Sequence, residues 1–248
     1  MIEYWGGSQF PPRDWQFEAL PKIIECLKNG QQPIVSATMG AGKSILIAEL
    51  CWVAMHKLKP DQKIIIAAPR QHLVEQLAAT VGKRVGDDNV GLFYSHQKQV
   101  GPPVIVCCYA SVKKLAYRLD DKRCGMLIGD EVHGTESDMF KEAYEIIHPS
   151  CAVGFTATPF RSEANKSLTL WDSVAYRYTA KDALKDGVIV PWKLVHWDGS
   201  KFDKTQVDEI CIDLITKHGK GQGIVNALSI KDAEEFAGLL RSRGHLAE

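Results

Sequence analysis

The sequence predicts an α/β protein built on a mostly parallel, doubly wound sheet. Short β-branched runs alternate with longer amphipathic segments, and several of the runs are apolar almost throughout. A strand with an unbroken apolar run has both faces covered, as in a parallel sheet between two layers of helices. The chain has 248 residues, which is about one and two-thirds domains of ordinary size. We therefore expect one full domain and part of a second.

The first domain is expected to contain strands and helices in alternation. Residues 33–37 predict a strand, and residues 43–58 predict a helix because apolar residues recur there at helical spacing. The other expected elements are strands over 63–68, 104–109, 126–130 and 152–156, and a helix over 70–81. Ser111 can cap a further helix that follows the strand over 104–109.

A second pattern begins after residues 161–179, which are less periodic and are interpreted as a connector. The expected elements there are strands over 192–197 and 223–228, and helices over 207–217 and 231–241. The predicted division is a first domain over 1–175, followed by the connector and a partial second domain over 176–248.

Composition narrows the class of protein. The chain is 45% hydrophobic with a formal net charge of zero, which favours a soluble globular protein and argues against one that coats nucleic acid through bulk charge. A local basic path remains compatible with that balance. No apolar run is long enough to cross a bilayer and no signal peptide is visible, so we expect a cytoplasmic protein without a membrane partner. Seven cysteines without a Cys-x-x-Cys pattern favour reduced thiols.

A phosphate-binding loop is predicted between the first strand and the first long helix. Its residues are Ala37, Thr38, Met39, Gly40, Ala41, Gly42, Lys43 and Ser44, with Ala37 in place of the usual first glycine. The glycines let successive N–H groups turn inward towards phosphate oxygens, and the helix N-terminus adds its dipole. Lys43 can bridge the β- and γ-phosphates of ATP, and the Ser44 hydroxyl can ligate Mg²⁺. The plain alternative is a glycine-rich turn with a chance Gly-Lys-Ser.

A pair of carboxylates follows the strand over 126–130. Asp130 and Glu131 open the sequence Asp-Glu-Val-His, which ends at His133. The carboxyl end of a strand lies on the ligand edge of an open α/β sheet. Asp130 is therefore the candidate for holding Mg²⁺, and Glu131 for polarising the attacking water. Alone, this pattern could equally be an acidic surface turn.

Small hydroxyl residues end another strand. Thr156-Ala157-Thr158 precedes Pro159, and these hydroxyls could bond back to His133. Taken alone, this segment is more simply explained as the end of a strand and a turn that stops at proline.

These three motifs, in this order and rough spacing, resemble those of superfamily 2 helicases, the DEAD/DEAH-related group. Asp130–His133 is similar to a DExH box. The resemblance implies a RecA-like doubly wound sheet of the P-loop NTPase type, with a second RecA-like lobe that is incomplete here. It also implies ATP and Mg²⁺ as cofactors, Lys43, Asp130 and Glu131 as catalytic residues, and His133, Thr156 and Thr158 as residues that couple the nucleotide to nucleic acid.

Further segments extend the resemblance over nearly the whole chain. It implies Arg13 and Gln16 near the adenine, and Arg70 and Ser111 at the nucleic-acid backbone. Residues 185–191 resemble the connector between lobes in phage and bacterial repair-type members, and residues 223–229 resemble the opening motif of the second lobe. A simpler interpretation of Arg13 and Gln16 is that they are polar positions on an amphipathic first helix. A simpler interpretation of Arg70 and Ser111 is that they are plain helix caps.

The family's arginine-finger motif has no match in this sequence. An arginine finger accelerates hydrolysis by roughly 10³–10⁵. We therefore expect weak turnover by this chain alone, with the finger supplied by the missing remainder of the second lobe or by a partner.

The sequence predicts an ATP-dependent helicase or translocase, with hydrolysis coupled to movement on nucleic acid. The connector resemblance favours DNA over RNA. Two alternatives stay open: a duplex-DNA translocase such as a restriction-type motor subunit, and a nucleotide-binding regulatory module without efficient catalysis. A small-molecule P-loop kinase is more distant, because its chemistry does not need the Asp130–His133 and Thr156–Thr158 motifs.

Overall fold

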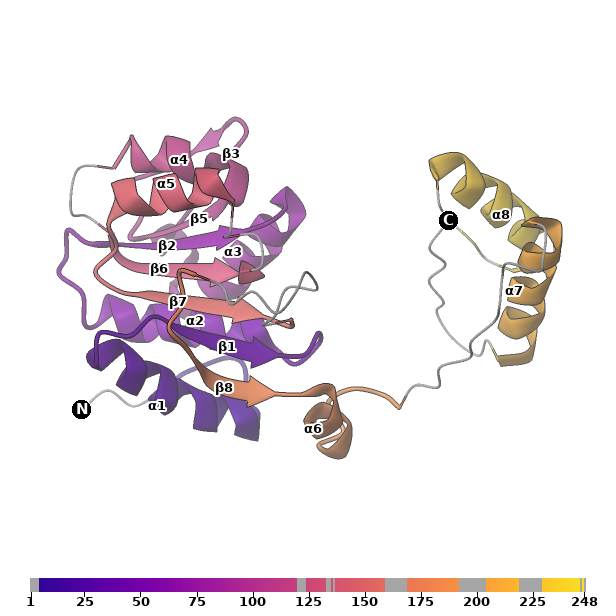
Figure 1. Ribbon diagram of the computed structural model, residues 1–248, viewed down its shortest axis with the longest axis horizontal. Coiled ribbons are helices and arrows are strands. Elements are labelled where there is room, and N and C mark those ends of the chain that lie inside the picture. Colours follow the sequence, from indigo (N-terminus) through magenta and orange to yellow (C-terminus); the bar gives the residue numbers. More distant parts are fainter. Residues whose placement is uncertain are drawn as a thin grey trace. The chain divides into compact units, whose positions relative to one another are not determined.

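The computed structural model describes residues 5–119, 124–132, 135, 137–158, 169–191, 204–218, 229–245 and 247. The chain divides into two compact units, Met1–Pro191 and Trp192–Glu248. The first unit holds a sheet covered by helices, and the second contributes two helices to the described residues (Figure 1).

The first unit is built on an eight-stranded sheet in the order β4-β3-β5-β2-β6-β7-β1-β8. Only the short pair β3–β4 is antiparallel, and the other neighbours are parallel. The arrows of β1, β2, β6 and β7 point the same way in Figure 1, so their carboxyl ends share one edge. The strands are β1 (Pro33–Ala37), β2 (Lys63–Ala68), β3 (Val90–Tyr94), β4 (Gln97–Lys98), β5 (Val104–Cys108), β6 (Cys124–Asp130), β7 (Ala152–Thr156) and β8 (Ser173–Tyr178).

Helices cover both faces of this sheet. One face packs against α1, α2 and α3, and the other packs against α4 and α5. The helices are α1 (Asp14–Lys28), α2 (Lys43–Met55), α3 (Gln71–Val85), α4 (Tyr109–Ala116), α5 (Asp138–Ile147) and α6 (Ala180–Lys185), with a 3₁₀ turn over Asp87–Asn89. This three-layer arrangement confirms the predicted doubly wound α/β fold.

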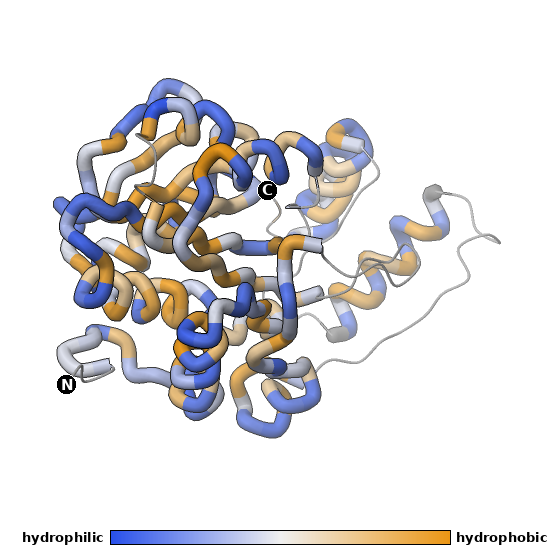
Figure 2. The backbone as a smooth tube through the Cα atoms, turned by 60° about the vertical axis from the view of Figure 1, so that its left-hand side comes forward, coloured by the Kyte–Doolittle hydropathy of each residue, from blue (hydrophilic) through white to orange (hydrophobic). Residues whose placement is uncertain are grey.

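The pleat of each strand explains why the central strands are apolar throughout. Ile64 and Ile66 belong to the hydrophobic cluster under α1, α2 and α3, whereas Ile65 belongs to the cluster under α4 and α5. Successive side chains of a strand point to opposite faces, so both must be apolar when both faces are covered. In Figure 2 hydrophobic colour runs along the strands, and hydrophilic colour concentrates on the outer turns of the surrounding helices and loops.

The predicted strands over 33–37, 63–68 and 152–156 have the same bounds in the structure. The helix expected over 43–58 ends at Met55, and Ser111 lies inside α4 rather than at its cap, which is Cys108. The prediction of Ser111 as a helix cap is therefore wrong, because the helix begins directly where β5 ends.

The segment over 161–179, interpreted as a connector, contains a strand of the sheet. β8 pairs with β1, and α6 follows it within the first unit. As an edge strand, β8 is only partly buried, so its sequence lacks the unbroken apolar run that marks the central strands. The pair β3–β4 and the helix α5 were not predicted either.

The second unit is described through α7 (Lys204–His218) and α8 (Ile230–Ser242), close to the two helices predicted there. Ile212, Phe236 and Leu240 form its buried cluster. The side chain of Ser229 caps α8 by accepting a hydrogen bond from the backbone N–H of Asp232. The strands predicted over 192–197 and 223–228 lie outside the described residues.

All seven cysteines are free thiols. Within the described part of the chain, no helix combines the length and the apolar character that crossing a membrane requires.

A buried ion pair ties α2 to α3 in the first unit. Arg84 Nε lies 2.6 Å from Glu49 Oε2, and the two side chains are 5% and 1% exposed. Glu49 Oε1 also accepts hydrogen bonds from Arg84 Nη2 and the backbone N–H of Trp5, while the guanidinium lies 4.2 Å from the ring centre of Trp52. These contacts satisfy both charges away from water.

We predict that Arg84→Met destabilises the first unit by about 3–5 kcal/mol, because it leaves the Glu49 carboxylate buried without its cation. Urea denaturation followed by circular dichroism measures the change in the free energy of unfolding. Lys113→Met is the control, because it breaks the exposed pair Lys113–Glu142 and should barely move the midpoint. Equal effects of the two substitutions would contradict the prediction.

Candidate nucleotide-binding site

The predicted phosphate-binding loop joins β1 to α2 at the carboxyl edge of the sheet. Gly40 and Gly42 have φ angles of +73° and +96°, a conformation that residues other than glycine rarely adopt. α2 begins at Lys43 without a side-chain cap. The first N–H groups of a helix have no acceptor within the helix, so this end is suited to an anion.

Residues at the start of α1 hold the backbone of this loop. Arg13 Nη1 donates hydrogen bonds to the carbonyl oxygens of Gly40 and Ala41, at 2.9 and 2.7 Å. Gln16 Nε2 donates to the carbonyl oxygen of Gly42 at 2.9 Å, and Gln16 Oε1 accepts from the backbone N–H of Arg13 at 2.8 Å. The two residues expected near the adenine thus contact the loop itself.

Trp15 adds a contact that sequence reasoning missed. Its Nε1 donates to the carbonyl oxygen of Ala41 at 3.1 Å, and its ring stacks on Tyr178 at the end of β8. The backbone N–H of Thr38 in turn donates to the carbonyl oxygen of Tyr178 at 3.0 Å. No local signal marks Tyr178, because its position depends on β8 pairing with β1.

The acidic motif lies one strand away from the loop. β7 separates β6 from β1 in the sheet, so the ends of three strands bring together Asp130 and Glu131, Thr156, and the loop after β1. Lys43 Nζ lies 3.4 Å from Glu131 Oε1 and donates to the carbonyl oxygen of Ala37 at 3.0 Å. Thr156 Oγ1 donates to Glu131 Oε2 at 3.3 Å.

The Lys43–Glu131 pair is shielded but still accessible. The side chains are 11% and 24% exposed, so water screens their attraction less than at an open surface. Glu131 has φ +54°, a strained value for a residue with a side chain. Such strain persists only where neighbouring residues hold the backbone.

Tyr109 and Trp171 hold the turn that carries Glu131. The Tyr109 hydroxyl donates to the carbonyl oxygen of Asp130 at 2.6 Å. On the other side, Thr135 Oγ1 donates to the carbonyl oxygen of Val132 at 2.6 Å, and Trp171 Nε1 donates to Thr135 Oγ1 at 3.2 Å. The sequence alone did not predict that Tyr109 and Trp171 hold this turn.

The remaining predicted residues take more scattered positions. Met39 is 76% exposed, whereas Ser111 is only 9% exposed, so little of its hydroxyl is accessible. Ser44 lies in the first turn of α2, and Arg70 is the exposed N-cap of α3. The backbone N–H of Thr158 donates to Thr156 Oγ1 at 3.1 Å. His133 lies outside the described residues, so its predicted bond to Thr156 stays a prediction.

Among the described residues, no group of three or more His, Cys, Asp or Glu side chains could hold a metal ion. The oxygen donors that the sequence predicts for Mg²⁺ at this edge are the Ser44 hydroxyl and the Asp130 carboxylate. Mg²⁺ commonly binds through one or two protein oxygens together with phosphate oxygens and water. These two donors therefore fit Mg²⁺ that arrives with a nucleotide.

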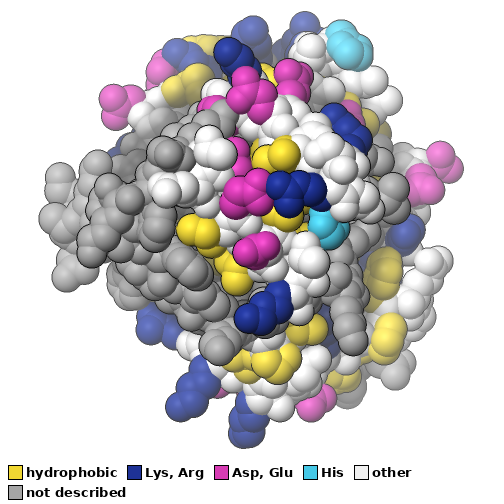
Figure 3. Space-filling model, turned by 90° about the vertical axis from the view of Figure 1, so that its right-hand side faces the viewer, with side chains coloured by type: hydrophobic (Ala, Val, Ile, Leu, Met, Phe, Trp, Pro, Cys, Tyr) yellow, Lys and Arg dark blue, Asp and Glu magenta, His cyan; other side chains and the backbone are white. Residues whose placement is uncertain are grey.

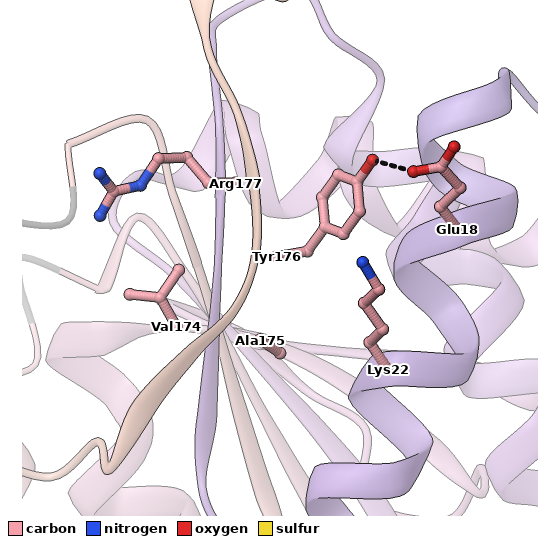
Figure 4. Close-up of a pocket in the computed structure, with 6 residues that line it drawn as sticks. All are labelled: Glu18, Lys22, Val174, Ala175, Tyr176 and Arg177. Carbon is pink, nitrogen blue, oxygen red and sulfur yellow. Dashed lines mark hydrogen bonds between the residues drawn. The ribbon is translucent and has the colours of Figure 1, made fainter.

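An open pocket of about 520 Å³ lies elsewhere, between α1 and β8 (Figure 4). The Tyr176 hydroxyl donates to Glu18 Oε2 at 2.6 Å, and Lys22 Nζ lies 4.8 Å from the centre of the Tyr176 ring. None of the residues that line it belongs to the motifs described above.

Comparison with known proteins decides the family. Residues 9–161 match the model of the family described as ResIII, "Type III restriction enzyme, res subunit". The chain belongs to this family. It is also 26% identical over 212 residues to the type I restriction enzyme EcoAI endonuclease subunit of Escherichia coli, a match that covers 79% of the chain and 25% of that protein.

Solved structures agree with this family at the level of the fold. A fragment of a putative HsdR subunit of a type I restriction enzyme from Vibrio vulnificus YJ016 is 16% identical with a TM-score of 0.72, covering 96% of this chain and 47% of that chain. The UvsW helicase of bacteriophage T4 is 18% identical with a TM-score of 0.57, covering 70% and 62%. Together these matches confirm the resemblance to superfamily 2 helicase-type ATPases and the RecA-like fold.

We predict that Gly42→Ala weakens both folding and nucleotide binding. A Cβ atom at this position would lie 2.9 Å from Gln16 Nε2, on a backbone with φ +96°. We expect a loss of more than about 1 kcal/mol in the free energy of unfolding, and a clear loss of affinity for a fluorescent ATP analogue.

Gly187→Ala is the matched control for Gly42→Ala. Gly187 also has a positive φ, at +66°, but no atom lies within 4 Å of the added Cβ. The Gly187→Ala variant should lose free energy of unfolding through backbone strain, but it should keep its affinity for the ATP analogue. If the two variants bind the analogue equally well, close packing of Gln16 on the loop does not govern binding.

Proposed function

We propose that this chain is the ATP-hydrolysing part of a motor that moves on DNA. The observation that supports it best is the contact of Lys43 with Glu131, and of Glu131 with Thr156, across the ends of three adjacent strands. This contact joins a phosphate-binding loop to a carboxylate, which are the two groups that hydrolysis of a nucleoside triphosphate requires.

Each residue has a separate task in this proposal. The N–H groups at the start of α2 and the Lys43 ammonium bind the phosphates, and Ser44 and Asp130 hold Mg²⁺. Bound Mg²⁺ neutralises charge that develops on the phosphate oxygens. Glu131 orients the attacking water and accepts its proton, and Thr156 holds the carboxylate in place. Arg13 and Gln16 keep the loop in shape and lie on the side proposed for the adenine.

DNA is proposed as the nucleic acid because of the relatives. The similar structures include a SWI2/SNF2 ATPase core of Sulfolobus solfataricus in complex with double-stranded DNA and a type ISP restriction-modification enzyme, LlaBIII, bound to DNA. On the face drawn in Figure 3, basic and acidic side chains are intermixed, in keeping with zero net charge. Binding would therefore use local contacts to the DNA backbone. The exposed Arg70 is the proposed contact, whereas the buried Ser111 is not kept as one, and His133 and Thr158 are proposed coupling residues.

The ResIII family and the EcoAI relative favour a restriction-type motor subunit that translocates on duplex DNA over a strand-separating helicase. A strand-displacement assay beside a triplex-displacement assay separates the two, since a translocase removes a third strand without unwinding the duplex. The chain spans about a quarter of the length of the EcoAI subunit, so the activity of a whole motor is part of this proposal.

We propose that turnover by these 248 residues is slow, since the sequence carries no match to the arginine-finger motif. A regulatory module that binds ATP without hydrolysing it is the competing function. The two proposals differ in whether Glu131 affects the rate.

We predict that Glu131→Gln lowers the rate of ATP hydrolysis roughly 10²–10⁴-fold, the usual contribution of a positioned general base. ATP affinity should change little, because Glu131 contacts Lys43 rather than the loop backbone. Single-turnover hydrolysis of radiolabelled ATP with protein in excess measures the rate. Glu142→Gln is the control, because Glu142 is an exposed carboxylate on α5. An unchanged rate in Glu131→Gln would favour the regulatory module.

We also predict that duplex DNA binds this chain more tightly than duplex RNA of the same sequence. Binding to backbone phosphates releases counterions, so the logarithm of the affinity should fall linearly with the logarithm of the salt concentration, with a slope of about −0.9 per phosphate contact. Fluorescence anisotropy between 50 and 200 mM salt, about the range in which this effect is large, measures the affinity for each duplex and its dependence on salt. Equal affinity for RNA, or an affinity independent of salt, would count against the proposal.

A further inference from the structure

The hydrogen bond from Tyr109 reaches the peptide group that precedes Glu131. Its hydroxyl lies 2.6 Å from the carbonyl oxygen of Asp130. A carbonyl oxygen can only accept a hydrogen bond, so the Tyr109 hydroxyl is the donor.

Tyr109 is itself closely packed. It is 8% exposed, and its ring meets the Phe140 ring of α5 edge to face, with centroids 5.2 Å apart. It is also the first residue of α4, directly after β5. A fixed ring on a fixed helix places the hydroxyl at one position relative to the end of β6.

The bond acts where the backbone is strained. The carbonyl of Asp130 belongs to the peptide plane that joins it to Glu131, and the φ angle of Glu131, +54°, is the rotation relative to that plane. Anchoring this carbonyl fixes the peptide plane relative to which φ is measured, and the contacts of Val132 on the other side of the turn limit the rotation itself. Together they set the direction in which the Glu131 side chain leaves the strand. Without the anchor, the backbone would be free to relax towards the ordinary region.

The other side of the same turn is already locked by packing. The Val132 side chain fits against Gly129 and Gly154, since a Cβ atom at either glycine would lie 2.8 Å from Val132 Cγ1. Thr135 also holds the carbonyl oxygen of Val132. Glu131 thus sits between two anchored peptide groups, and Tyr109 supplies the one nearer to β6.

We propose that Tyr109 is a positioning residue for Glu131 and sets the direction of its carboxylate through the carbonyl of Asp130. This inference rests on the proposed function, because it assumes that Glu131 acts on the water that attacks ATP. Positioning matters for such a group, since a displacement of about 1 Å can cost roughly 10²-fold in rate.

The test is Tyr109→Phe, which keeps the ring and removes only the hydroxyl. We expect single-turnover ATP hydrolysis to fall roughly 10-fold, less than the cost of a displacement of about 1 Å, because the contacts of Val132 still hold the other side of the turn. The dissociation constant for ATP should stay within about twofold. Tyr144→Phe is the matched control, because its hydroxyl donates to Gln32 Oε1 at 2.6 Å, ahead of β1 and away from the motifs. It should hydrolyse ATP at the wild-type rate.

A double variant separates positioning from general structural damage. In a Glu131→Gln background, ATP hydrolysis is slow and is followed over hours. Adding Tyr109→Phe there should not lower the rate further, because the carboxylate that Tyr109 positions is already gone. A merely structural role would slow both backgrounds equally. That result would overturn the inference, as would a matching change in the dissociation constant for ATP, or a Tyr109→Phe rate equal to that of Tyr144→Phe.

Failure of the proposed function gives a different pattern. If the wild-type chain does not hydrolyse ATP, or Glu131→Gln hydrolyses it at the wild-type rate, the proposed function fails and the inference falls with it. If Glu131→Gln is slow while Tyr109→Phe is not, the inference alone is overturned.

Discussion

The candidate site depends on the ion pair between Lys43 and Glu131, which joins two motifs from distant parts of the chain. The pair forms because β1, β7 and β6 are parallel neighbours whose carboxyl ends meet at one edge of the sheet. Thr156, at the end of the middle strand, bonds to the same carboxylate. If the order of these strands were different, the loop after β1 and the acidic motif after β6 would lie too far apart for Lys43 to pair with Glu131.

Two backbone segments with positive φ angles meet at this ion pair, the loop with Gly40 and Gly42 and the turn at Glu131, and each is held by residues outside the pair. Arg13 and Gln16 of the α1 region bind the carbonyl oxygens of the loop. Tyr109 and Thr135 bind the carbonyl oxygens on either side of Glu131. In both places these residues bind backbone carbonyl oxygens, whereas the side chains of Lys43 and Glu131 are held by each other, by the carbonyl oxygen of Ala37 and by Thr156.

The fold and the family restrict what this edge of the sheet can do. The chain belongs to the ResIII family and has the RecA-like fold of superfamily 2 helicase-type ATPases. A loop suited to phosphates beside a hydrogen-bonded carboxylate is the basis of the nucleotide hydrolysis that we propose.

The sequence by itself determined the fold class, the central strands and the motifs at their ends, because unbroken apolar runs and glycine-rich turns are local signals. β8 was not predicted because it lies at the edge of the sheet and is only partly buried, so its sequence lacks the unbroken apolar run of the central strands. Ser111 was misplaced as a cap because α4 begins directly at the end of β5. The tertiary structure alone decided that Tyr109 meets Asp130 and that Trp15 meets the loop. Such contacts depend on strand order and register, which no local pattern encodes.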